Sequence, residues 1–169
     1  MCVTVTRDDS VYVEYERLET PLLEKVMRNA VAAYAWKLRT RGRSAYEEVQ
    51  YGPPRSKLDL VVRADRATSW RAVRRVLDAA RECRFLKIRF LVATRSGIGD
   101  IETFLVDPRA GSVETRVRVR PGSTEAFMRP DDEHHERRVS VEADPDTPFE
   151  RVVQTLAAFD RTGANVGIR

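Results

Sequence analysis

Apolar and polar residues alternate near the start of the chain in a way that predicts a β-hairpin. Residues 3–5 and 11–15 are rich in the β-branched and aromatic side chains that strands favour. Between them, residues 7–10 carry Asp and Ser side chains, which readily bond to their own backbone in turns. We therefore expect two antiparallel strands at this end of the chain.

The period then changes, and residues 20–38 repeat apolar side chains at the three- and four-residue spacing of an amphipathic helix. Thr20 precedes Pro21, so the Thr20 hydroxyl is expected to cap this helix, with the proline at its first position. Residues 40–57 follow with glycine, proline and little periodicity. They predict a surface connection.

A strand, a helix and a second strand are predicted next. Residues 58–62 form a short apolar run that suits an interior strand, and Asp65 follows its end. Thr68 is placed to cap the next helix, which is apolar on one face and rich in arginine on the other. Residues 87–92 alternate as a strand, so the three segments form a βαβ unit with a right-handed crossover.

The same pattern recurs near the C-terminus. Residues 147–150, Thr-Pro-Phe-Glu, form a capping box with proline at the first helical position. Asp144 lies 144 − 65 = 79 residues after Asp65. The same shift pairs Thr68 with Thr147. We interpret this as an internal duplication; the alternative is that any two βαβ units share a strand, a cap and a helical period.

The segment between the two βαβ units predicts a further hairpin. Residues 101–106 and 113–119 have strand composition and flank a turn at residues 107–111. Residues 121–136 are rich in Pro, Gly, Asp and Glu and predict a loop.

These elements together predict an α+β fold with a mixed sheet and helices mainly on one face. Two related units are expected, each a β-hairpin followed by a βαβ unit, over residues 1–95 and 96–169. We expect the halves to pack together, so that one polypeptide mimics a dimer with sheet edges or helices at its internal interface.

Composition adds limits on function. An apolar fraction of 42% supports a packed core, and 33% charged residues indicate a well-solvated surface. The net charge of +4 is spread along the chain, which permits a nucleic-acid partner without requiring one. The longest uncharged apolar stretch, residues 29–36, is far shorter than the roughly 20 residues of a membrane span. No signal peptide is recognised, and Cys2 and Cys83 predict no structural disulfide.

Candidate catalytic and metal-binding residues are few. Residues 131–136 contain Asp, Glu and the two histidines, but adjacent histidines in an extended segment point to opposite sides, which favours a solvated loop. Asp65 and Asp144 end strands before helices, where a carboxylate serves as a structural cap more often than as a catalyst. No nucleophile motif accompanies them. We expect no enzyme activity, no cofactor and no small-molecule substrate.

The arginine-bearing face of the second helix is the candidate partner-binding surface. Its members are Arg71, Arg74, Arg75 and Arg81. With the basic residues between 37 and 43, they also support an alternative function as a soluble nucleic-acid-binding or general interaction module. A solvated helix face remains open as the simplest interpretation.

The order of elements and several short motifs resemble the ExbD/TolR family of biopolymer transport proteins. The likeness covers residues 3–94 and rests on Arg63-Ala64-Asp65, Val76-Leu77-Asp78-Ala79-Ala80, Phe85-Leu86-Lys87-Ile88 and Val92-Ala93-Thr94. It implies a non-enzymatic soluble domain of a proton-motive-force-coupled transport complex. It further implies ExbB/TolQ-like and TonB/TolA-like partner proteins, and dimers formed by two chains or by the two halves of this one.

The chain also differs from the family pattern. Arg84 stands where the family has glycine at the end of the second helix, whereas the second copy has Gly163 there. The connection over residues 40–57 is long for the family, and the membrane helix with its proton-responsive aspartate is missing, so proton coupling is not expected in this chain. The resemblance implies a site at the periplasmic face of the inner membrane if an upstream membrane helix was removed, and the cytoplasm otherwise.

Overall fold

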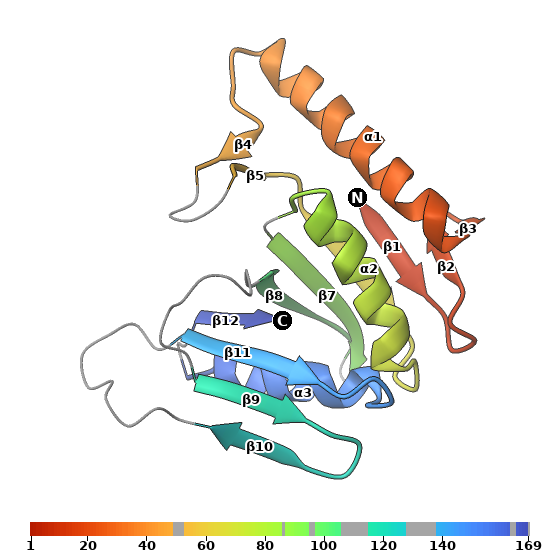
Figure 1. Ribbon diagram of the computed structural model, residues 1–169, viewed down its shortest axis with the longest axis vertical. Coiled ribbons are helices and arrows are strands. Elements are labelled where there is room, and N and C mark those ends of the chain that lie inside the picture. Colours follow the sequence, from red (N-terminus) through yellow and green to blue (C-terminus); the bar gives the residue numbers. More distant parts are fainter. Residues whose placement is uncertain are drawn as a thin grey trace.

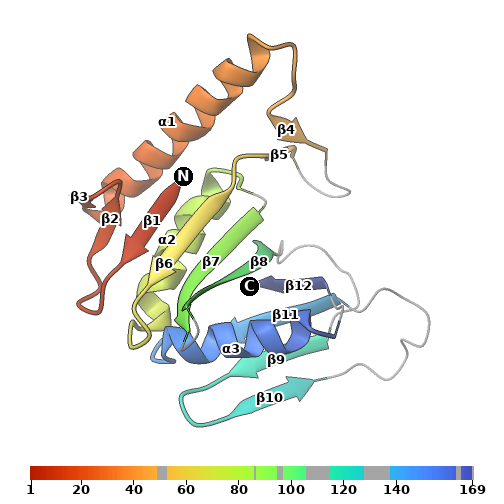
Figure 2. The ribbon, with the colours of Figure 1, turned by 180° about the vertical axis from the view of Figure 1, so that it is seen from behind.

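The computed structural model is built around one large, twisted mixed sheet with helices packed against it (Figures 1 and 2). It describes residues 1–48, 53–85, 87–94, 97–105, 115–127, 138–162 and 165–168. This architecture confirms the predicted α+β fold class.

The first half supplies seven strands and two helices among the described residues. They are β1 (Cys2–Val5), β2 (Val11–Val13), β3 (Glu16–Leu18), α1 (Thr20–Arg39), β4 (Tyr46–Glu47), β5 (Arg55–Ser56), β6 (Leu60–Ala64), α2 (Trp70–Glu82) and β7 (Lys87–Thr94). β4 and β5 pair with each other as a separate two-stranded sheet. The other strands of this half join the main sheet, with β1, β6 and β7 parallel to one another.

The second half supplies the rest of the sheet. Its elements are β8 (Gly97–Leu105), β9 (Thr115–Val119), β10 (Thr124–Phe127), β11 (Arg138–Ala143), α3 (Phe149–Asp160) and β12 (Asn165–Ile168). The order across the main sheet is β10-β9-β11-β12-β8-β7-β6-β1-β2-β3. β8 therefore joins the two halves, antiparallel to β7 and parallel to β12.

The strand pairing corrects the predicted second hairpin. β8 and β9, which contain most of residues 101–106 and 113–119, are not neighbours, because β12 and β11 lie between them. β9 instead forms a hairpin with β10, a strand inside residues 121–136, which were predicted to be loop. The physical reason is that alternation identifies a strand but not its partner, and the short connections after β7 and β9 favour local hairpins.

One face of the sheet carries the core. The registers place Val3 beside Val62, Val62 beside Phe90, and Phe90 beside Ile101, and the apolar side of this series packs against α1 and α2. In the second half, Val141 lies beside Val117 and Ile168 on the side that packs against α3. The core is thus continuous through both halves.

Three aromatic rings mark the place where the halves meet. The Phe90 ring of β7 lies 6.5 Å from the Trp70 ring of α2 and 5.4 Å, edge to face, from the Phe149 ring of α3, measured between centroids. All three side chains are 1% exposed or less. Full burial of one such ring stabilises a fold by about 1.5–3 kcal/mol, so this cluster contributes substantially to the attachment of α2 to α3.

The helix starts of the two halves also exchange backbone hydrogen bonds. The Trp70 N–H donates to the Thr147 carbonyl at 2.8 Å, and the Phe149 N–H donates to the Thr68 carbonyl at 2.9 Å. The exchange is reciprocal under the sequence shift, since 149 − 70 = 79 and 147 − 68 = 79. The first N–H groups of a helix have no partner inside it, and here each half supplies the partner for the other.

The next pair of donors repeats this exchange. The Arg71 N–H donates to the Pro145 carbonyl at 2.8 Å, and the Glu150 N–H donates to the Arg66 carbonyl at 3.2 Å. These residues too are related by the shift of 79, since 150 − 71 = 79 and 145 − 66 = 79. A local two-fold relationship therefore joins the two βαβ units.

The predicted helix caps were wrong by one residue in each case. Predicted caps were Thr20, Thr68 and Thr147, whereas the N-cap residues are Glu19, Ser69 and Pro148. Ser69 caps α2 by accepting from the Ala72 N–H at 3.4 Å. For α2 and α3 the reason is tertiary: the pairing of Thr68 and Thr147 with the opposite half keeps the next residue extended, which delays the helix start.

Candidate functional site

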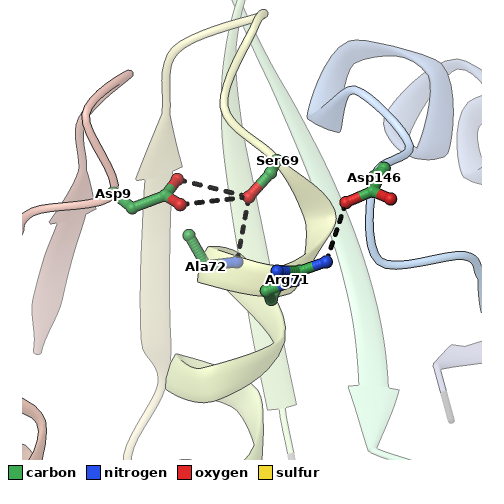
Figure 3. Close-up of polar contacts among 5 residues, drawn as sticks. All are labelled: Asp9, Ser69, Arg71, Ala72 and Asp146. Carbon is green, nitrogen blue, oxygen red and sulfur yellow. Dashed lines mark hydrogen bonds and ion pairs between the residues drawn. The ribbon is translucent and has the colours of Figure 1, made fainter.

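The arginines predicted to bind a partner lie on α2 as expected, but most are engaged within the chain. Arg71 pairs with Asp146 of the second half at 2.9 Å, as Figure 3 shows. Arg81 and Arg74 approach Asp78 at 2.7 and 3.9 Å. Arg75 is exposed and has no ion pair among the described residues. The carboxylates thus neutralise much of this helix face.

The two aspartates at the strand ends make local contacts. Asp65 accepts a hydrogen bond from the Ala67 N–H at 2.9 Å, which is an Asx turn before α2. Asp144 lies 3.7 Å from the Arg120 guanidinium. Both contacts fit the structural role predicted for these side chains.

The start of α2 is also occupied by side chains. Ser69 Oγ donates to the Asp9 carboxylate, with the two oxygens 3.2 and 3.4 Å away, while it accepts from the Ala72 N–H (Figure 3). Asp9 is held in the left-handed region, with φ of 62°, by the turn after β1. This network ties the first hairpin to α2 and places the negative charge of Asp9 beside that helix end.

Candidates for metal or thiol chemistry are limited in the described part of the chain. It contains no group of three or more His, Cys, Asp or Glu residues that could hold a metal ion. Residues 131–136 and Gly163 lie outside the described residues. Cys2 and Cys83 are free thiols, and Cys83 is buried with its Sγ 3.5 Å from the Glu24 carbonyl oxygen.

A groove lies on the face of the first half that the helices leave open. It has a volume of about 570 Å³ and is lined by Cys2, Thr4, Thr6, Tyr12, Glu14, Tyr15 and Arg63. Their strand neighbours Val3, Val5, Val13 and Val62 are buried on the helix side. The alternation of each strand therefore separates core residues from groove residues.

Three side chains form a row across the groove. Strand register places Thr4 of β1 directly beside Tyr12 of β2 on one side and Arg63 of β6 on the other. Arg63 is exposed, and it has no hydrogen bond or ion pair among the described residues. The row offers a cation without a partner in the described part of the chain, a hydroxyl group and an aromatic ring, separated by two strand spacings of about 4.7–4.9 Å each.

A strained turn borders the groove. Glu14 and Tyr15 connect β2 to β3 and both adopt positive φ, 49° and 78°, the geometry of a two-residue turn that favours Asn-Gly. Left-handed backbone costs roughly 1–2 kcal/mol per non-glycine residue. The Tyr15 side chain is 97% exposed, so this strained turn places an aromatic ring in solvent. Strain of this kind often accompanies binding sites.

This groove was not predicted from the sequence. Residues 11–15, which include Tyr12 and Tyr15, were predicted to form one strand, whereas the strand ends at Val13 and the chain turns there. The available signal was Arg63 between two apolar residues of a strand, which indicates an outward-facing charge. Its alignment with Tyr12 depends on pairing between strands far apart in sequence.

Comparisons with known proteins give no relative. No protein-family model, curated protein or solved structure matches the chain. None of the helices in the described part of the chain combines the length and apolar character needed to span a bilayer.

Proposed function

We propose that this chain is a non-enzymatic binding module that acts by protein–protein contact, as the soluble domain of an ExbD/TolR-like transport complex. The observation that carries the proposal is the pair of sheet ends. β3 and β10 close the ten-stranded sheet, and each pairs on one side only among the described residues. A free strand edge carries unpaired N–H and C=O groups and can accept an extended segment of another protein.

The arrangement of the halves supports a pseudo-dimer in one chain. Reciprocal hydrogen bonds, between Trp70 and Thr147 and between Phe149 and Thr68, join the two βαβ units at the starts of α2 and α3. A dimer of separate chains would offer two edges, and this single chain offers β3 and β10. On this proposal the partners are ExbB/TolQ-like and TonB/TolA-like proteins, following the resemblance of residues 3–94.

The location follows from the same proposal. An ExbD/TolR-like role places the domain at the periplasmic face of the inner membrane when a membrane helix precedes it, and otherwise in the cytoplasm. Reading the gene upstream of Met1 for an apolar segment that contains an aspartate decides between these two places.

Site-specific photo-crosslinking tests the proposal directly. A benzophenone amino acid is placed at Arg17 on β3 or at Thr124 on β10, both exposed, and at exposed Gln154 on α3 as the matched control. The chain is co-expressed with the ExbB/TolQ-like and TonB/TolA-like proteins of the same genome. Cross-links from either edge to one of these proteins, without cross-links from Gln154, support the proposal. An equal yield from all three positions, or none from the edges, refutes it.

Nucleic acid remains the second candidate because of basic side chains on the open sheet face. Arg63 and Lys87 are exposed and Arg89 is half-buried on the neighbouring strands β6 and β7, and Lys87 lies 3.4 Å from Glu102. These side chains add to the arginine-bearing face of α2, on which the predicted alternative rests and which Asp78 and Asp146 partly neutralise. Binding of a fluorescent single-stranded oligonucleotide that weakens steeply with salt supports this candidate, whereas a strand-addition interface is much less salt-sensitive.

A further inference from the structure

We propose that the groove on the open face of β1, β2 and β6 binds an extended peptide segment through a carboxylate of that peptide, which pairs with Arg63. This inference goes beyond the proposed function, because the groove lies on the sheet face rather than at the edge strands β3 and β10, and it names the chemistry of the ligand. The evidence comes from a comparison of the two halves of the chain, which build the same three-strand surface from different side chains.

The second half contains the counterpart of the groove row. In the first half, Thr4 lies between Tyr12 and Arg63. In the second half, Arg118 of β9 lies in the same way between Glu125 of β10 and Glu142 of β11. Arg63 and Glu142 are related by the shift of 79, since 142 − 63 = 79.

The charged side chains of the row in the second half form ion pairs within this surface. Arg118 lies 3.8 Å from Glu142, and Arg120 lies 3.1 Å from Glu125 and 3.7 Å from Asp144. Cations and carboxylates alternate there across neighbouring strands, which stabilises the sheet surface. This surface has no unpaired charge to offer among the residues named.

The row in the first half lacks these carboxylates. Thr4 replaces the central arginine and Tyr12 replaces one glutamate, so Arg63 is left without a partner in the described part of the chain. Guanidinium groups bind carboxylates through two parallel hydrogen bonds, a geometry that gives both affinity and orientation. The missing partner of Arg63 is therefore expected to be a carboxylate supplied by a ligand.

The remaining lining favours a peptide over a nucleic acid. Tyr12 and the exposed ring of Tyr15 offer apolar and aromatic surface to side chains. Glu14 stands in the turn at the Cys2 end of the groove, where it repels a second negative charge. A nucleic-acid strand needs several cations for its successive phosphates, whereas a peptide needs one cation for one carboxylate. The groove lining contains one arginine and no lysine.

The test begins with a library of random dodecapeptides displayed on phage and selected on the full chain. Selected peptides are expected to share an Asp, a Glu or a free C-terminal carboxylate. Their affinity, measured by fluorescence anisotropy, is expected to fall at least about tenfold with Arg63→Glu and to stay unchanged with Arg75→Glu, the exposed arginine on α2. Replacement of the acidic peptide residue by Lys is expected to restore binding to Arg63→Glu.

A second pair of variants tests the aromatic wall. Tyr15→Ser is expected to weaken peptide binding several-fold, whereas Trp36→Ser, which removes the 71% exposed ring of α1, leaves it unchanged. Circular dichroism and thermal unfolding establish that each variant is folded. Because the side chains of Arg63 and Tyr15 are exposed, folding is expected to survive both changes.

Three outcomes overturn the inference. Selected peptides without a carboxylate, affinity that is insensitive to Arg63→Glu, or oligonucleotide binding at Arg63 in preference to peptide would each do so. The proposed function fails separately: it is refuted if the edge positions Arg17 and Thr124 give no partner cross-links, whatever the groove binds. Edge cross-links that persist in Arg63→Glu, together with unchanged peptide affinity, leave the function standing and reject the groove.

Discussion

The Trp70 N–H donates to the carbonyl oxygen of Thr147 at 2.8 Å, and this bond joins the first turn of α2 to the loop that starts α3. Its counterpart runs from Phe149 to Thr68. Each βαβ unit thus completes the helix start of the other, since a buried helix end without partners is costly. Neither α2 nor α3 has a satisfied N-terminus without the opposite half.

Because the halves complete each other, they are expected to unfold together. Phe149→Ala removes a fully buried ring at the junction and is expected to lower the free energy of unfolding by about 3–5 kcal/mol. Urea unfolding is followed by far-ultraviolet circular dichroism and by Trp70 fluorescence in a Trp36→Phe background. The two probes are expected to give one midpoint, in wild type and in the variant.

Phe159→Ala is the control for this prediction. Phe159 lies on the same helix but is only partly buried, so the expected loss is clearly smaller. Separate midpoints for the two probes, or equal losses for Phe149→Ala and Phe159→Ala, would contradict a shared core at the junction.

Arg84→Gly is expected to stabilise the chain. Arg84 follows the end of α2 with φ of 64°, and the flanking bonds from Phe85 N–H to the Ala80 carbonyl and from Arg84 N–H to the Arg81 carbonyl, both 3.0 Å, form a Schellman motif. Glycine adopts this conformation without strain, so we expect a gain of about 1 kcal/mol in the free energy of unfolding.

Arg75→Gly is the opposite control for Arg84→Gly. It introduces glycine inside α2 and is expected to cost about 1 kcal/mol. Chemical denaturation of both variants shows whether each change raises or lowers the free energy of unfolding. A loss of stability for Arg84→Gly would show that the Arg84 side chain stabilises the fold by more than the strain of its backbone costs.

The two junction threonines are expected to respond differently to the same change. The Thr147 hydroxyl donates to the Val119 carbonyl at 3.2 Å, while the buried Thr68 hydroxyl has no partner among the described residues. Thr147→Val is expected to cost about 1 kcal/mol, and Thr68→Val to be neutral or stabilising, because an unpaired buried hydroxyl is unfavourable. Thermal unfolding of the two variants, measured side by side, tests this difference. Equal losses of stability in the two variants would refute it.

Cys83 is expected to resist alkylation until the pH is high. Burial raises the pKa of the Cys83 thiol, although the nearby Arg28 guanidinium acts in the opposite direction. Because the folded-state pKa is raised, the associated stability is present below the pKa of the unfolded chain and is lost as pH rises through the folded-state pKa. Mass spectrometry after iodoacetamide treatment should show Cys2 modified first, and faster labelling of Cys83 at neutral pH would contradict this.

Local periodicity predicted much of the fold. The helical spacing over residues 20–38 gave α1, and the short apolar run at residues 58–62 gave β6 within one or two residues. Both βαβ units and the α+β class were predicted in the same way, because a strand of period 2 and a helix of period 3.6 are local properties of the chain.

Pairing between distant strands was the main source of error. β8 was expected beside β9 but lies between β7 and β12, and β10 was expected to be loop. Alternation tells which residues share a face of one strand, not which strand lies alongside it. The row of Tyr12, Thr4 and Arg63 was missed for the same reason.

The sequence by itself determined the elements of this protein and the shift of 79 residues that relates Asp65 to Asp144. Only the tertiary structure decided that Thr68 and Thr147 pair with opposite halves rather than cap their own helices. It also decided that Arg63 has no partner among the described residues, whereas Glu142 at the equivalent position meets Arg118. The physical reason is that helical and strand periods arise from neighbouring residues, whereas the partner of a carbonyl or a guanidinium group depends on which distant segment the packed core brings beside it.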